Sequence, residues 1–385
     1  MDEHLHPRLQ GFGTTIFTEM SALAVRTGAI NLGQGFPDTD GPAEVAEAAA
    51  HALRDGANQY PPLPGVPELR EAVAAHQARF YGIDLDPDRQ VQITVGATEA
   101  IAAALLALCG PGDEVIALDP TYDSYAASIA MCGATKRVVK LRAPGLALDP
   151  AELRAAVTDR TRVLLVNSPH NPSGKVLDAD ERQAIADVAV EHDLIVITDE
   201  VYEHLVFEGE HVPLATLPGM AGRTLSISSG GKTFSFTGWK VGWATGPAEL
   251  VTAVRTAKQF LTFSGGGPFQ RAIAVGLGLG DDYFDGLRAD FRTKRDLLCS
   301  GLETAGFDVI VPQGAYFVTV DVRPLGTDDG VEFCRELPDR CGVVGIPSAV
   351  FHDDPSDAKH LVRFAFCKRR EVLDDAVERL VRLRS

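Results

Sequence analysis

The sequence has 385 residues, of which 45% are hydrophobic and 23% charged, a composition typical of globular proteins. A chain of this length predicts two domains, because single hydrophobic cores stop growing at about 250–300 residues. Asp and Glu outnumber Lys and Arg by 53 to 36, and the net charge of −17 argues against nucleic acid or an anionic membrane as a partner.

The six cysteines are scattered and form no Cys-x-x-Cys pair, so they predict neither a metal site nor a disulfide framework. Buried, reduced thiols are typical of cytoplasmic proteins. The first residues lack the basic and apolar segments of a signal peptide, and the longest apolar run, Ile101 to Cys109, is about half of the ~20 residues that span a bilayer. We therefore expect a cytoplasmic protein without a membrane segment.

Residues up to Pro42 are rich in Gly and Thr and contain the segment Asn31-Leu-Gly-Gln-Gly-Phe-Pro-Asp38. Gly33 and Gly35 resemble the start of a dinucleotide-binding fingerprint, but its third glycine is missing and Pro37 intrudes. The glycines instead predict a loop whose backbone passes close to a substrate.

Helical patterns cover residues 43–54 and 67–80, and a proline-rich loop at 58–65 separates them. Tyr60 stands on this loop. It is either a packing aromatic or a side chain that presents its hydroxyl to a ligand or to a neighbouring subunit.

The segment 91–118 predicts strand, turn, helix, turn and strand. Val91 to Val95 is the expected strand, Gly96-Ala97-Thr98 the turn, and Thr98 the N-cap of a helix that begins at Glu99. Free amides at the start of such a helix bind phosphate well. An ordinary capped βαβ unit explains the pattern equally well.

Apolar strands predicted at 162–166, 194–198 and 225–228 alternate with helical patterns at 151–157 and 180–192. This alternation indicates an α/β fold with a mostly parallel sheet covered by helices on both faces. Ligands bind beyond the carboxyl ends of the strands in such sheets. Polar side chains stand at or just after those ends: Asn171, Asp199, Tyr202, Ser229 and Lys232.

Lys232 follows the strand at 225–228 and two glycines, Gly230 and Gly231, which let the backbone approach a flat ring or a phosphate. Ser229 and Lys240 offer a hydroxyl and a second cation to hold an anion. This arrangement indicates a site for a phosphorylated aldehyde that is bound covalently to the lysine. A surface lysine in a Gly/Ser loop is the alternative, but the neighbouring side chains are apolar and aromatic.

Beyond residue 280 the pattern changes to a long helix (281–304), short strands (307–311, 315–320 and 360–366) and helices from 330 and 371. We expect a large domain over residues 43–280, a smaller α+β domain over 281–385, and an N-terminal segment, 1–42, that joins the small domain. Arg363 interrupts an apolar strand. A buried arginine needs an anionic partner, either a distant Asp or Glu or a substrate carboxylate.

Four of these residues together describe one chemistry. Lys232 would form a Schiff base with an aldehyde, and Asp199 would keep a pyridine nitrogen protonated so that the ring accepts electrons. Tyr202 and Asn171 would hydrogen-bond the oxygen on the ring.

The remaining residues would hold anions. Ser229, Lys240 and the amides of Ala97 and Thr98 would anchor a phosphate, and Arg363 would clamp an α-carboxylate with its two parallel N–H groups.

Five motifs, in order along the chain, resemble the fold type I, pyridoxal-phosphate-dependent aminotransferases of class I/II. They are Asn58-Gln-Tyr60, Thr94-Val-Gly-Ala-Thr98, Asn167-Ser-Pro-His-Asn-Pro-Ser-Gly174, Thr198-Asp-Glu-Val-Tyr202 and Ser228-Ser-Gly-Gly-Lys-Thr-Phe234. The resemblance covers nearly the whole chain. Within the family it points to the branch of kynurenine/glutamine and methionine aminotransferases and actinobacterial N-succinyldiaminopimelate aminotransferases.

The resemblance implies that Lys232 carries pyridoxal 5'-phosphate and moves a proton between the amino acid and the cofactor. Tyr122 would stack on the pyridine ring. Tyr60 would reach the phosphate in the other subunit, which makes a homodimer the functional unit. Gly35 would bind the substrate carboxylate through its backbone amide.

Phe17 and Phe263 fall where related enzymes place aromatic residues that face the substrate. Two positions depart from the family. Many relatives have an arginine where this chain has Lys240, and some kynurenine-active relatives have a histidine where it has Ser264.

The expected function is transfer of the α-amino group of an L-amino acid to a 2-oxo acid such as 2-oxoglutarate by a ping-pong mechanism. A β-lyase or a biosynthetic enzyme is an alternative, because Lys232, Asp199 and Arg363 serve all of these reactions. A third alternative is a non-catalytic effector-binding domain of the kind fused to transcription factors, but such a regulator would need a DNA-binding domain in front of it. Aromatic side chains favour aromatic, methionine or glutamine donors, whereas an N-succinyldiaminopimelate donor would need a further basic residue that the sequence does not single out.

Overall fold

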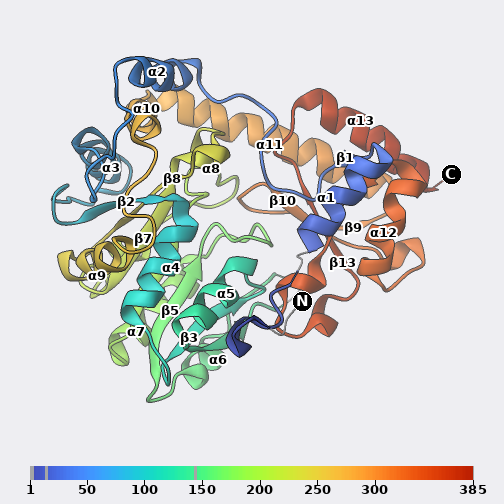
Figure 1. Ribbon diagram of the computed structural model, residues 1–385. Helices are drawn as coiled ribbons and strands as arrows, with labels where there is room; N and C mark the ends of the chain where they lie inside the picture. Colours follow the sequence, from blue (N-terminus) through green and yellow to red (C-terminus); the bar gives the residue numbers. More distant parts are fainter. Residues whose placement is uncertain (1–3, 14–15, 143–144, 385) are drawn as a thin grey trace.

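A seven-stranded sheet forms the centre of the molecule (Figure 1). The computed structural model describes residues 4–13, 16–142 and 145–384. In the order β2-β8-β7-β6-β5-β3-β4, the sheet contains β2 (Val91–Val95), β3 (Glu114–Asp119), β4 (Thr135–Lys140), β5 (Thr161–Asn167), β6 (Ile195–Asp199), β7 (Thr224–Ser229) and β8 (Val241–Thr245). All pairings from β4 to β7 are parallel, and β8 runs antiparallel to both of its neighbours. The predicted, mostly parallel sheet is confirmed, and β4 and β8 are additions that the sequence analysis does not predict.

Helices cover both faces of this sheet, because alternate residues of one strand point to opposite sides. Val163 and Leu165 of β5 lie in a core with α4 (Gly96–Leu108), α5 (Asp123–Cys132) and α9 (Ala248–Lys258). Leu164 and Val166 lie in a second core with α6 (Pro150–Ala156) and α7 (Ala179–Glu191). Burial on both sides explains why the strands are continuously apolar.

Three helices pack at the β2 end of the sheet. They are α2 (Ala43–Arg54), α3 (Pro67–Tyr81) and α10 (Gly267–Leu277). Their apolar residues share a core with Val91, Ile93 and Trp243.

A second, four-stranded antiparallel sheet has the order β12-β13-β10-β9. Its strands are β9 (Asp308–Ile310), β10 (Phe317–Asp321), β12 (Ile346–Pro347) and β13 (Leu361–Ala365). The helices around it are α11 (Asp281–Thr304), α12 (Gly330–Cys341) and α13 (Arg370–Val381). The long helix has the bounds that the sequence predicts.

Residues 16–31 of the N-terminal segment lie beside this second sheet, whereas the short 3₁₀ helix Pro7–Leu9 contacts α5. Helix α1 (Ile16–Thr27) packs on α12, and β1 (Ile30–Asn31) pairs in parallel with β11 (Val343–Val344). In Figure 1 the blue α1 therefore lies among the orange and red elements of the C-terminal part. The sequence analysis places the segment there but does not predict the helix.

The start of α4 differs from the prediction. The helix begins at Gly96, so the expected turn at 96–98 and the N-cap role of Thr98 are wrong. The Glu99 carboxylate accepts a hydrogen bond from the Val95 amide at 2.6 Å and caps the helix from within its first turn. Gly96 has a φ of +75°, a conformation that glycine adopts without strain, and the strand can therefore turn directly into the helix.

The cysteines follow the prediction. All six are free, and five of them are buried. Within the described part of the chain, no helix combines the length and the hydropathy needed to cross a membrane.

Candidate active site

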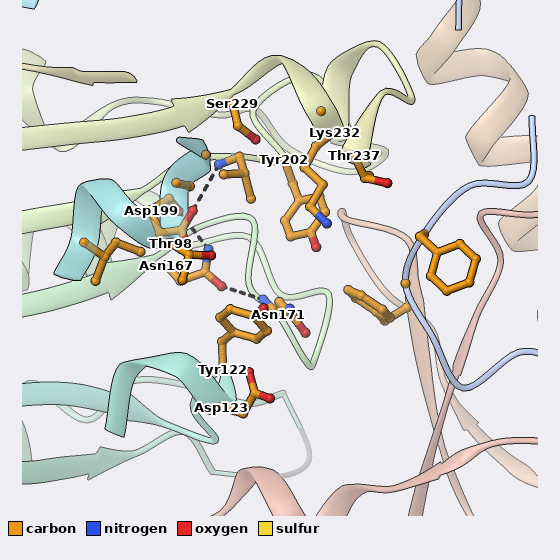
Figure 2. A pocket seen from close by; sticks show the side chains of 18 of the residues that line it. Thr98, Tyr122, Asp123, Asn167, Asn171, Asp199, Tyr202, Ser229, Lys232 and Thr237 are labelled. Carbon is orange, nitrogen blue, oxygen red and sulfur yellow. Dashed lines mark hydrogen bonds between the residues drawn. The ribbon is translucent and has the colours of Figure 1, made fainter. Parts of the chain in front are cut away.

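A cavity of about 390 Å³ lies at the carboxyl ends of β5, β6 and β7, and residues of the second sheet close it. Twelve of the predicted site residues line it: Phe17, Gly35, Ala97, Thr98, Tyr122, Asn171, Asp199, Tyr202, Ser229, Lys232, Lys240 and Arg363. Figure 2 shows the side chains of Lys232, Asp199 and Asn171 pointing toward one space, with Tyr122 on its other side.

Tyr60 and Phe263 do not line the cavity of their own chain. Tyr60 is 84% exposed, and its ring packs edge-on against Phe263 with 6.0 Å between the ring centroids. Both therefore belong to one exposed aromatic surface.

Lys232 lies in the four-residue helix α8 (Gly230–Thr233), directly after β7. Its Nζ donates a hydrogen bond to the Tyr316 hydroxyl at 3.1 Å, and this hydroxyl donates to the Gly35 carbonyl at 2.6 Å. Burial lowers the pKa of Lys232. A lowered pKa makes the neutral, nucleophilic amine more available near neutral pH.

Gly35 is constrained by the second sheet. A Cβ at this position would lie 2.5 Å from the Phe317 ring, so only glycine lets the 33–37 loop lie this close to β10. The backbone of the loop consequently faces the cavity, as the sequence analysis predicts.

Asp199 ends β6 and is only 5% exposed. Its carboxylate accepts hydrogen bonds from the Tyr125 hydroxyl at 2.6 Å and from the Val201 amide at 3.3 Å. Burial raises the pKa of Asp199, and the two hydrogen bonds oppose this shift. Among the described residues, Asp199 has no ion-pair partner, and Lys232 acts on it only at longer range.

Arg363 lies in β13 and is 2% exposed. It donates to Asn171 Oδ1 at 2.9 Å and to the Gly33 carbonyl at 3.2 Å, while its buried Nε finds no hydrogen-bond partner within the part of the chain that the structure describes. The guanidinium lies over the rings of Phe317 and Phe351, at 4.0 and 4.5 Å from their centroids. Burial lowers the pKa of Arg363 to about 10, so it stays charged near neutral pH.

The sequence analysis leaves open a distant Asp or Glu as the partner of Arg363. Within the described residues no carboxylate forms an ion pair with it. A guanidinium with a free N–H beside a cavity is suited to a carboxylate ligand.

The first turn of α4 forms one end of the cavity. Ala97, Thr98, Ser229 and Lys240 line this end, and the Lys240 ammonium lies so close to Gly96 that a Cβ there would be 3.1 Å from it. Free amides of a helix N-terminus, a hydroxyl and a cation make an anion site.

The sequence analysis missed several lining residues, among them Asp123, Tyr125, Asn167 and Phe317, as well as Tyr316 next to Lys232. Tyr122 stands at the N-cap of α5 and Tyr125 lies in its first turn, so their spacing of three residues could have indicated that both side chains face the same way. No local pattern marks Tyr316, because its partners Gly35 and Lys232 are distant in sequence.

The cavity thus presents a buried carboxylate and a buried guanidinium, neither of which pairs with an opposite charge among the described residues, together with an amine and an anion site at one end. Pyridoxal phosphate fits this set, because it carries a ring nitrogen that can be protonated, an aldehyde and a phosphate, and an amino-acid substrate supplies the carboxylate. Fold and site together define a pyridoxal-phosphate-dependent enzyme of fold type I.

The chain belongs to the family "Aminotransferase class I and II", whose model matches residues 27–380. A solved structure of N-succinyldiaminopimelate aminotransferase from Mycobacterium tuberculosis is 54% identical, has a TM-score of 0.96, and covers 98% of this chain and 99% of its own. Methionine aminotransferase of Escherichia coli is 43% identical over 98% of this chain and 97% of its own length. Kynurenine–oxoglutarate transaminase of Dictyostelium discoideum is 36% identical over 97% and 95%.

The protein is therefore an aminotransferase that depends on pyridoxal phosphate, and it transfers an amino group to a 2-oxo acid. The predicted family, fold class, enzyme class and cofactor are confirmed.

Proposed function

We propose that the chain takes the α-amino group from L-amino acids with neutral side chains, of the methionine, glutamine or aromatic type, and passes it to a 2-oxo acid such as 2-oxoglutarate by a ping-pong mechanism. One observation supports this donor class. Among the described residues that line the cavity, the cationic side chains are Lys232, Lys240 and Arg363, and each already has a place in cofactor or α-carboxylate binding. Phe17, Phe36 and Phe317 contribute aromatic side chains to the same lining.

Lys232 and Asp199 carry the chemistry in this proposal. Bound pyridoxal phosphate supplies an electron-accepting ring. Lys232 holds the cofactor and moves the proton at the substrate Cα, and its lowered pKa suits it to act as a base. Asp199 gives the ring nitrogen a carboxylate counter-ion, and Tyr125 holds that carboxylate in place.

Other residues orient the reactants. Tyr202 and Asn171 hydrogen-bond the ring oxygen, and Tyr122 stacks on the ring. Ser229, Lys240 and the first turn of α4, with Ala97 and Thr98, anchor the phosphate. Arg363 and the Gly35 amide bind the α-carboxylate, and Phe17 faces the side chain of the substrate. The sequence analysis assigns the same role to Phe263, but Phe263 does not line the cavity of its own chain.

A second candidate donor is N-succinyldiaminopimelate, because the solved relative at 54% identity carries that name. This donor bears further carboxylates, for which the described cavity of one chain provides no additional cation.

The test is a single-turnover experiment on the holoenzyme without an oxo acid, in which the absorption of the bound cofactor is followed. Methionine, glutamine and phenylalanine should each convert the cofactor at least about tenfold more efficiently than N-succinyldiaminopimelate. A reversed ratio would establish the second candidate. Release of pyruvate or ammonia with an unchanged cofactor spectrum would assign the chain to the lyases instead.

We propose further that the enzyme is a cytoplasmic homodimer, built from a large domain (43–280), a small domain (281–385) and an N-terminal segment (1–42) that joins the small one. The exposed aromatic residues Tyr60, Phe260 and Phe263 support the dimer, because such a surface is typical of an interface. The two separate sheets support the domain division.

A subunit-mixing experiment tests whether Tyr60 acts on the other subunit. Tyr60→Ala and Lys232→Ala dimers are each expected to have low activity. A mixed dimer contains one site with an intact Lys232 and an intact Tyr60 only if Tyr60 acts in trans, and it should then regain about half of the wild-type activity per dimer. Mixed dimers without such recovery would assign Tyr60 to its own chain.

Tyr125→Phe should shift the pH–activity profile. The Tyr125 hydroxyl lowers the pKa of Asp199, so its removal raises that pKa and the carboxylate is protonated at a higher pH. The acidic limb of kcat/KM should move up by about one pH unit. Tyr283→Phe is the control, because Tyr283 donates a hydrogen bond to the Thr233 carbonyl at 2.8 Å and does not contact Asp199. An acidic limb that stays in place in Tyr125→Phe would contradict the role of Tyr125.

A further inference from the structure

A cluster of two histidines and a glutamate lies outside the catalytic cavity, between α3 and the segment that follows β6. The Nε2 atoms of His76 and His204 face each other at 2.8 Å. Imidazole nitrogens are the commonest nitrogen ligands of metal ions in proteins.

Glu203 completes the cluster. One ligand atom from each of His76, Glu203 and His204 lies within 4.8 Å of the others. The Glu203 carboxylate accepts hydrogen bonds from the Ser228 hydroxyl and from the Tyr81 hydroxyl at 2.7 Å. Such outer contacts orient a carboxylate that binds a metal.

The cluster has both access and room to adjust. Glu203 and His204 line a cavity of about 310 Å³, from which an ion and a water ligand can enter. Two nitrogens on one tetrahedral Zn²⁺ lie roughly 3.3 Å apart, given Zn–N bonds of about 2.0–2.1 Å. Among the described residues the His76 Nδ1 has no hydrogen-bond partner, so the ring is held by its packing against Phe80 and Phe284 and by the contact with His204. A shift of a few tenths of an ångström is the adjustment that a metal ion requires.

We propose that His76, Glu203 and His204 bind one divalent ion of the zinc class, with a water from the adjoining cavity as the fourth ligand. Imidazole with a single carboxylate favours Zn²⁺ or Co²⁺, whereas Mg²⁺ and Ca²⁺ require more oxygen ligands. The ion ties α3 to Glu203, which bonds to Ser228 at the end of β7. Binding therefore stabilises the end of β7, which leads directly into α8 and Lys232, and it adds no ligand to the catalytic cavity.

The holoenzyme is treated with a chelator and desalted to remove free cofactor. It is then titrated with Co²⁺, whose binding is followed by absorption spectroscopy, and with Zn²⁺, whose bound amount is determined by metal analysis. We expect one ion per chain, visible absorption typical of four-coordinate Co²⁺, and a melting temperature that is higher by about 2 °C or more at saturation. His204→Gln and His76→Gln should weaken binding at least about 100-fold.

His211→Gln is the matched control. His211 lines the same cavity but contacts Glu200 at 3.4 Å and does not belong to the cluster, so this variant should bind Co²⁺ like the wild type. His204 is half-buried, so the His204→Gln variant is expected to fold even if the variant of the fully buried His76 does not. Absence of equimolar binding, or undiminished binding in His204→Gln, would overturn the proposal.

Discussion

Replacing Lys232 with alanine should reduce turnover by at least about 10⁴-fold, the largest effect that we expect from any single substitution. Under the proposed mechanism, the variant loses both the amine that holds the cofactor and the base that moves the substrate proton. Its fold should persist, because the Lys232 side chain makes one hydrogen bond, to Tyr316 at 3.1 Å. We expect the free energy of unfolding to change by less than about 2 kcal/mol, measured by denaturant titration.

Lys294→Ala is the control for Lys232→Ala. Lys294 is also a shielded lysine, with an 8% exposed side chain, but it pairs with Asp290 in α11 and does not line the cavity. Its loss should leave turnover within about twofold of the wild type. Substantial turnover in purified Lys232→Ala would show that another residue moves the proton.

Replacing Arg363 with alanine should lower kcat/KM for the amino donor by about 100-fold or more, chiefly through a higher KM. The substitution removes a buried cation that we assign to the substrate carboxylate, and the loss of one partner of such a pair costs about 2–5 kcal/mol. Arg363→Lys should recover only part of the loss, because an ammonium cannot make the two parallel hydrogen bonds of a guanidinium.

Arg295→Ala distinguishes this effect from a general loss of stability. Arg295 is 7% exposed and pairs with Glu208 and Asp296, away from the cavity. It should lower the melting temperature and leave KM unchanged. An unchanged KM in Arg363→Ala would mean that the carboxylate binds elsewhere.

The parts of the fold that the sequence predicts well are those governed by local periodicity. Helices α2 and α11 have the predicted bounds, and the strand Val91–Val95 is confirmed. The polar residues at the strand ends line one cavity because parallel strands end at the same edge of a sheet.

The features that the sequence analysis missed depend on tertiary contacts. Tyr316 reaches Lys232 across 84 residues, and Tyr125 reaches Asp199 across 74, separations that no local pattern encodes. The start of α4 was misplaced because Gly96 turns directly from strand to helix, and a cap from Glu99 replaces the one expected from Thr98.

The position of the N-terminal segment has a consequence for biosynthesis. Gly33 and Arg363, which bond to each other beside the cavity, stand 330 residues apart. At about 5–20 residues per second, the ribosome needs roughly 15 to 70 s to make the strand that carries Arg363 after it has made the loop that carries Gly33. During that interval α1 and β1 have no native partner, and their apolar residues, including Met20 and Ile30, stay exposed. Nascent chains of this enzyme should therefore depend on chaperones longer than an enzyme whose N-terminus folds within its own domain.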